Sequence, residues 1–333
     1  MKSREFFTTD QNPEDEEDIS KLEQESFERI SRRANTNEQE NKSFQEALSK
    51  IDFKDLKEMF SADAVRSGIE ENELNFVEAS TIVNTKREGE QRSADAFYTM
   101  LANRISLNYE GIKQCAAEAG VSSELYLLHV IAHEETHAVS KVSCQGISEL
   151  DRREVGQGSI QSGFKGDIVV PMDAGGKKKY FHKAAFFGFD EGVTEKYARE
   201  EILYPYIENH ADFSSKEDLE KHKANLSRKD KNGFYKNEVA MVEAFVRALS
   251  RSTGFDTETI WKGMIHGKFS GNTMNEAGTY KLVEKMIGAE ILDNIKNLDI
   301  DHSDAARLIA EQLDKSDVAQ FDAMKNFLNN SND

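Results

Sequence analysis

The stretch IAHEETHAVS, residues 131–140, places two histidines four residues apart, with a glutamate directly after the first. On an α-helix, residues four apart lie on one face, about 6 Å from each other along the axis. The imidazoles of His133 and His137 can therefore reach one Zn²⁺ ion. Glu134 lies about 100° further around the helix, where it can reach a water beside the ion. The stretch predicts a helix that carries a zinc site and a general base.

The flanking residues favour a helix with defined ends. The segment YEGIKQCAAEAG, residues 109–120, has a helical pattern and stops at Gly120, a typical helix terminus. Ser122 and Ser123 each offer an N-cap for the next segment, residues 124–141. The motif is therefore expected on the second of two consecutive helices.

Two further polar residues share the predicted helix. His129 lies one turn before His133, so it is a candidate third ligand. A buried histidine with a hydrogen-bond partner is the preferred interpretation. Glu135 is expected to point to solvent.

A catalytic zinc site needs a third protein ligand and one open position. The segment FGFDEGVTEKYARE, residues 187–200, places Glu191 and Glu195 four apart on a predicted helix. One carboxylate can bind the metal while the other accepts a hydrogen bond from a ligand histidine. The alternative is an ordinary acidic helix N-terminus, stabilised by the helix dipole. Glu276, in TMNEAGTY, is the reserve candidate.

The pattern along the chain predicts an α+β fold: a small mixed sheet, the motif helix, then a mainly helical lobe. GDIVVPMDAGGKKKYFHKAAFF, residues 166–187, is expected to form a hairpin. The phenylalanines at 186, 187 and 189 suggest a buried strand or, less simply, a substrate pocket. Trp261 and Met264 are expected in a core. Strands are expected at 75–85, 94–100 and 103–109, and helices at 43–60, 190–203, 236–252, 257–266, 279–297 and 303–329, with a solvated helix and loop of mixed charge at 214–233.

Composition excludes several classes of protein. The chain has 333 residues and a net charge of −18, which disfavours nucleic acid as a partner. No apolar run approaches the roughly 18 residues of a membrane span. Two cysteines, Cys115 and Cys144, provide no disulfide framework. No Sec-type signal is visible at the start of the sequence, so a cytoplasmic location is the default expectation.

The chain is expected to divide into three parts. Residues 1–45 read as an acidic, mobile arm, residues 46–140 as a subdomain that contains the motif helix, and residues 141–333 as a hairpin insertion with a helical subdomain. The Lys-, Glu- and Asn-rich composition with only three prolines also resembles that of bacterial effectors exported by specialised secretion systems. Export would make a host protein the partner.

HEETH followed by DEGVTE resembles the gluzincin metallopeptidases over residues 95–290. This resemblance implies a zincin-like fold, in which His133 and His137 bind one catalytic Zn²⁺. It also implies that Glu134 is the general base and Glu191 the third ligand. Glu195 would be the carboxylate that accepts a hydrogen bond from a ligand histidine. NRISLNY, residues 103–109, is similar to the edge strand that lines the zincin cleft. Asp190 stands where many gluzincins have asparagine.

The implied activity is zinc-dependent endopeptidase cleavage of a protein or peptide, with zinc-bound water as the nucleophile, activated by Glu134. The tetrahedral intermediate needs an oxyanion donor, for which Tyr235 is the first choice. The other candidates are Tyr197, Tyr204, Tyr206, His182 and His210.

Three alternatives remain at this point. The chain can be a zincin-like zinc-binding protein that acts as an interaction or regulatory module without proteolysis. It can be a helical adaptor with a coincidental motif. Amidases and deformylases also use H-E-x-x-H, so the class of substrate rests on the resemblance alone.

Overall fold

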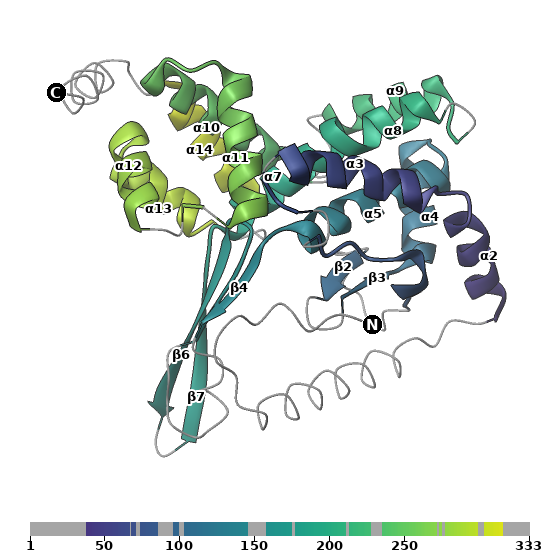
Figure 1. Ribbon diagram of the computed structural model, residues 1–333, viewed down its shortest axis with the longest axis horizontal. Coiled ribbons are helices and arrows are strands. Elements are labelled where there is room, and N and C mark those ends of the chain that lie inside the picture. The colour runs from purple at the N-terminus through teal and green to yellow at the C-terminus, as the bar shows by residue number, and fades with distance from the viewer. Residues whose placement is uncertain are drawn as a thin grey trace. The chain divides into compact units, whose positions relative to one another are not determined.

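A computed structural model of the chain contains two compact units, each with its own sheet and helices (Figure 1). Unit 1 comprises the described residues of Met1–Val139 and Tyr197–Gly233, and unit 2 those of Ser140–Lys196 and Phe234–Asp333. The described residues of 197–233, which the sequence places in the C-terminal subdomain, belong to unit 1. The structure describes residues 38–66, 68–70, 74–85, 96–99, 103–145, 158–174, 177–210, 213–227, 235–271, 273–274, 277–298 and 303–315.

Helix α5 (Ser123–Val139) is the central element of unit 1. Of its 17 residues, 14 are buried, so no side of it is a solvent face. It packs against the sheet strands, helix α4 and a π-helical segment, η4. The elements of unit 1 are α2 (Glu38–Leu48), α3 (Phe53–Arg66), η2 (Ala79–Thr81), β1 (Ile82–Asn84), β2 (Ala96–Thr99), β3 (Arg104–Leu107), α4 (Tyr109–Ala119), α5, η4 (Ala198–Leu203), α8 (Tyr204–Asn209) and α9 (Lys216–Ser227).

The predicted ends of α4 and α5 are confirmed. Gly120 adopts a left-handed backbone with φ 69° and closes α4 through its N–H to the carbonyl of Ala116. Glycine takes this conformation without a Cβ penalty. Ser122 Oγ then accepts a hydrogen bond from the Leu125 N–H at 3.3 Å, which caps α5.

The sheet of unit 1 has the order β1-β3-β2, with β1 parallel and β2 antiparallel to β3. The strand of NRISLNY is therefore central, and its expected place at a sheet edge is wrong. The strand predicted at 75–85 is present only at 82–84, because a 3₁₀ turn occupies 79–81. The segment KREGEQRS, residues 86–93, which reads as a turn in the sequence, lies outside the described residues.

The single helix predicted at 43–60 is two helices, α2 and α3. Asp52 Oδ1 accepts hydrogen bonds from the N–H groups of Lys54 and Asp55, so it caps a new helix start. Phe44, Leu48, Ile51 and Leu56, which are helically spaced in the sequence, are all buried. Helix α2 begins at Glu38, inside the expected arm; residues 1–37 lie outside the described part of the chain.

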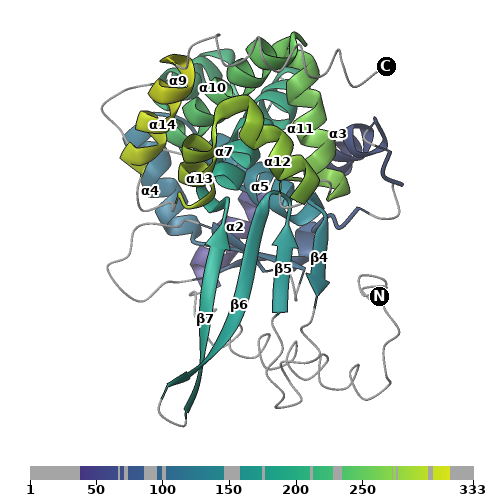
Figure 2. The same ribbon diagram turned by 90° about the vertical axis from the view of Figure 1, so that its left-hand side faces the viewer.

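Unit 2 contains a four-stranded antiparallel sheet with the order β4-β5-β6-β7 (Figure 2). The long hairpin of β6 and β7 confirms the predicted hairpin. The phenylalanine strand is wrong: a left-handed Phe186 (φ 58°) ends β7, and a helix begins at Phe187. The strands are β4 (Val142–Gln145), β5 (Gly158–Ser162), β6 (Lys165–Ala174) and β7 (Lys177–Ala185).

The helices of unit 2 follow the predicted order with one additional break. Gly288 (φ 93°) divides the predicted 279–297 helix in two. Helix α10 packs against α11, α12 and α14, and Trp261 and Met264 are buried as expected. The helices are α7 (Phe187–Tyr197), α10 (Lys236–Thr253), α11 (Thr257–Ser270), α12 (Ala277–Ile287), α13 (Ala289–Lys296) and α14 (Ser303–Lys315).

Mainly helical units with small sheets confirm the predicted α+β class. No described helix is both long enough and apolar enough to cross a membrane.

Candidate metal centre

His133 and His137 extend from consecutive turns of α5. Their ring centroids lie 5.0 Å apart, with 71° between the ring planes. His133 is buried and His137 is half-buried. The spacing seen in the sequence therefore does place two imidazoles side by side on one helix.

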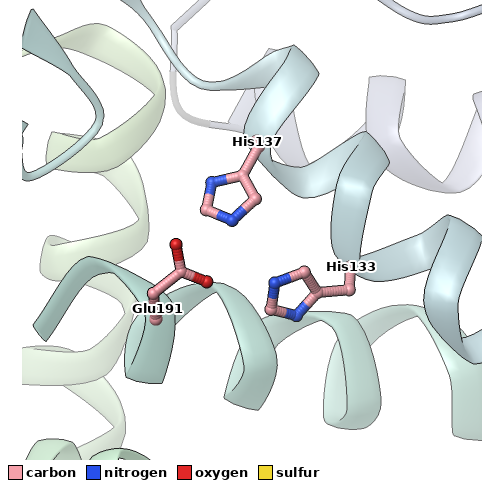
Figure 3. Close-up of side chains that lie close together, drawn as sticks. All are labelled: His133, His137 and Glu191. Carbon is pink, nitrogen blue, oxygen red and sulfur yellow. The ribbon is translucent and has the colours of Figure 1, made fainter. Parts of the chain in front are cut away.

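Glu191 contributes a carboxylate to the same cluster. It is a buried residue of α7. One ligand atom from each of His133, His137 and Glu191 can be chosen so that all three lie within 4.8 Å of one another. Figure 3 shows the Glu191 carboxylate facing the two imidazole rings. Among the described residues, this is the one group of three or more His, Cys, Asp and Glu side chains with such spacing.

Two more glutamates, Glu134 and Glu195, are close in sequence to the residues of this cluster. Glu134 follows the first histidine and is 8% exposed, so it is nearly buried while still in contact with solvent. Glu195, one turn after Glu191 on α7, is completely buried. A carboxylate held in so little water interacts strongly with neighbouring charges. Their predicted roles as base and supporting carboxylate stay predictions. Glu276, the reserve ligand, lies outside the described residues.

Glu135 is completely buried, so the prediction that it points to solvent is wrong. Its Oε2 accepts a hydrogen bond from the Val77 N–H at 3.1 Å, and its Oε1 has no hydrogen-bond partner among the described residues. Burial raises the pKa of this carboxyl well above its usual range, and the charges of Glu78 and Glu134 raise it further. The expectation failed because α5 has no exposed side on which a polar residue can stay hydrated.

His129 is a buried residue of α5 with its own partner. Its Nδ1 lies 2.8 Å from Nε2 of His222 on α9, and both rings are buried. The ring centroids are 4.9 Å apart in an edge-to-face arrangement. This matches the preferred interpretation of His129 as a hydrogen-bonded core histidine rather than a third ligand.

The oxyanion candidates differ in what their polar atoms contact. Tyr197 donates to Asp63 at 2.7 Å, and Tyr206 accepts from the Asp52 N–H at 2.7 Å. The Nε2 of His210 lies 3.0 Å from an Asp55 oxygen. These three groups are occupied within unit 1.

The remaining oxyanion candidates are Tyr235, Tyr204 and His182. Tyr235 is half-buried at the N-terminus of α10, with an unusual left-handed backbone (φ 48°). A positive φ at a non-glycine residue is uncommon and often marks a functional position. Tyr204 is half-buried on α8, with Lys223 above its ring. The side chain of His182 lies outside the described part. Tyr235 stays the predicted donor.

Lys268 of α11, which the sequence reasoning missed, is completely buried and lies 2.7 Å from Asp190 Oδ1. A sequence signal for it exists. Lys268 stands seven residues after Trp261 and four after Met264, which places it on the apolar stripe of α11. A lysine at such a position needs a buried partner, because an unpaired buried charge is costly.

The chain matches no protein-family model, and no significantly similar curated protein or solved structure was found. The assignment of a function therefore rests on the residues and on their geometry.

Proposed function

We propose that this protein is a zinc-dependent endopeptidase with a gluzincin-like arrangement of ligands. The observation that carries the proposal is the cluster of two imidazoles and one carboxylate, from His133, His137 and Glu191, with ligand atoms within 4.8 Å of one another. The packing of α5 against β2 and β3 also supports a zincin-like organisation, in which the motif helix lies against a sheet.

The donor set suits zinc. Imidazole nitrogen and carboxylate oxygen are the common ligands of catalytic zinc, which takes three protein ligands and leaves one position open. Ligand atoms at about 2.0–2.1 Å from a tetrahedral ion are about 3.3 Å apart. The observed limit of 4.8 Å thus requires only small side-chain movements. Calcium and magnesium prefer sites with oxygen ligands alone, so two imidazoles disfavour them.

Glu134 is the group that moves the proton. When bound, zinc lowers the pKa of water toward about 7 and polarises the scissile carbonyl. Glu134 then accepts a proton from the attacking water and delivers it to the leaving amine. Its near-complete burial limits competition from bulk solvent.

Glu195 completes the set as the carboxylate that orients a ligand histidine. A neutral imidazole binds metal through one nitrogen and donates its other N–H to a carboxylate or carbonyl group, which fixes the tautomer. Glu195 lies one turn from Glu191 and is buried, as such a partner must be. Tyr235 is assigned as the oxyanion donor, and the substrate as a peptide or protein.

The test is metal analysis beside digestion of a peptide library, read by mass spectrometry. Glu134→Gln should keep one zinc per chain and lose hydrolysis by about 10²–10⁴-fold, the usual contribution of a general base. Glu258→Gln, which alters an exposed α11 residue paired with Lys262, is the control and should cleave like wild type. Full activity of Glu134→Gln would overturn the proposal. One zinc per chain without cleavage of any peptide would instead select a binding module.

A further inference from the structure

Asp190 and Lys268 form an ion pair that is removed from solvent. The distance from Lys268 Nζ to Asp190 Oδ1 is 2.7 Å, and the two side chains, lysine and aspartate, are 0% and 1% exposed. Asp190 directly precedes Glu191 in the first turns of α7. The pair therefore links α11 to the residue beside the proposed third ligand.

The same carboxylate oxygen also binds the turn between β5 and β6. Asp190 Oδ1 accepts a hydrogen bond from the Phe164 N–H at 2.9 Å. The backbone N–H of Gly163 donates to the Lys141 carbonyl, and the backbone N–H of Lys141 donates to the Lys268 carbonyl. Three segments of unit 2 thus meet around one oxygen atom.

Gly163 is required for this arrangement. A Cβ at this position would lie 2.8 Å from Asp190 Oδ1 and 2.9 Å from Lys268 Nζ, which is closer than van der Waals contact allows. Its φ of +57° also disfavours any other residue. At Gly163, the turn between β5 and β6 thus leaves the space that the Asp190–Lys268 pair occupies.

The start of α7 is held from other directions as well. The N–H groups of Phe186 and Gly188 donate to the carbonyls of Lys296 and Leu298. A Cβ on Gly192 would lie 2.6 Å from the Glu238 carbonyl oxygen, so α7 and α10 backbones approach closely there. These contacts fix residues 186, 188, 190 and 192, and Glu191 lies between two fixed positions.

We propose that Asp190 and Lys268 are positioning residues that hold the first turns of α7 so that Glu191 faces the two histidines. This inference rests on the proposed zinc site. Burying two charged side chains costs more free energy than burying two apolar side chains of the same volume. A gain in stability is therefore a poor explanation for a buried ion pair. The charged hydrogen bond between Lys268 and Asp190 fixes the position of the residue beside the proposed ligand Glu191. Two apolar side chains would make no such directional contact.

The experiment measures zinc affinity by competition with a chelator, together with thermal unfolding of the metal-free full chain. The variants are Lys268→Met, the uncharged double variant Asp190→Asn/Lys268→Met, and Arg247→Met. The last removes a two-bond pair with Asp314 between α10 and α14, and it controls for loss of an ion pair in unit 2 away from the ligands.

Lys268→Met should lower both zinc affinity and thermal stability. The double variant leaves no buried unpaired charge, so its thermal stability should recover. Its zinc affinity should nevertheless stay about 10–100-fold below that of wild type, which is the usual effect of losing a residue that supports a metal ligand. Arg247→Met should bind zinc like wild type. Recovery of zinc affinity in the double variant would overturn the positioning role and leave the zinc site intact. Absence of zinc binding in wild type would overturn the proposed function itself.

Discussion

Glu135 Oε2 accepts a hydrogen bond from the Val77 N–H at 3.1 Å, in a part of unit 1 that solvent does not reach. This contact ties the segment before β1 to the middle of the motif helix. The carboxyl lies between the two predicted zinc-binding histidines in sequence and has a raised pKa because of its burial. The motif therefore contains a buried carboxyl whose protonation is linked to folding.

Glu135 gives the metal-free protein a distinct pH dependence. Because its pKa is higher in the folded chain than in the unfolded chain, where it is about 4.3, the folded state keeps the proton as pH rises while the unfolded state loses it. The free energy of unfolding should therefore fall with rising pH, by up to about 1.4 kcal/mol per pH unit. Glu135→Gln keeps an acceptor for Val77 and removes this loss, so its advantage over wild type should grow from pH 5 to pH 8 in denaturant titrations.

Glu124, in the first turn of the same helix, is the control of opposite sign. Its carboxylate accepts a hydrogen bond from Lys50 Nζ at 2.6 Å, and this contact lowers the pKa of Glu124. The stability that it contributes is present above the unfolded pKa and is lost as pH falls through the folded one. Glu124→Gln should therefore cost most at neutral pH. Unfolding curves of Glu135→Gln that run parallel to wild type at every pH would contradict the burial of a protonated Glu135.

Gly163→Ala should destabilise unit 2 more than its backbone conformation alone explains. The left-handed φ costs about 1 kcal/mol for a non-glycine residue, and the new methyl group would also displace the Asp190–Lys268 pair. Gly254→Ala is the matched control, since Gly254 has φ +78° and a Cβ at this position would have nothing within 4 Å. We expect a loss about 1–3 kcal/mol larger for Gly163→Ala, measured by denaturant unfolding. Equal losses would show that the ion pair tolerates the methyl group.

His129→Leu should affect stability and leave metal binding unchanged. The substitution removes the contact between His129 Nδ1 and His222 Nε2, and loss of a buried hydrogen bond costs about 1–3 kcal/mol. Because His129 is not a ligand, zinc content should stay at that of wild type, whereas His133→Ala should lose it. Loss of zinc in folded His129→Leu would instead make His129 part of the metal site.

The local features that sequence predicts well are those with short-range causes. Gly120 and Ser122 mark helix ends because one residue's backbone or hydroxyl group satisfies nearby groups, and the four-residue spacing in HEETH follows from the helical repeat. Glu191 could be chosen as a candidate because a catalytic zinc site takes a third protein ligand and because Glu195 follows four residues later. Its approach to His133 and His137, in contrast, depends on tertiary packing.

Features that depend on tertiary packing were not predictable in the same way. A glutamate such as Glu135 looks solvent-exposed until its helix is covered on every side. The run at 186–189 alternates like a strand, yet Phe186 takes a left-handed backbone and a helix starts after it. Lys268 could have been found from its place on an apolar stripe, but its partner Asp190, 78 residues away, could not.

The central claim is that Glu191 and the two histidines hold one zinc ion, and calorimetric titration of the metal-free chain with zinc tests it most directly. Wild type should bind one zinc per chain. Glu191→Ala should bind it at least about 100-fold more weakly, since loss of a ligand should exceed the 10–100-fold effect of a supporting residue, while Glu258→Ala should match wild type. Zinc binding by Glu191→Ala as tight as that of wild type, or no binding by wild type, would contradict the account.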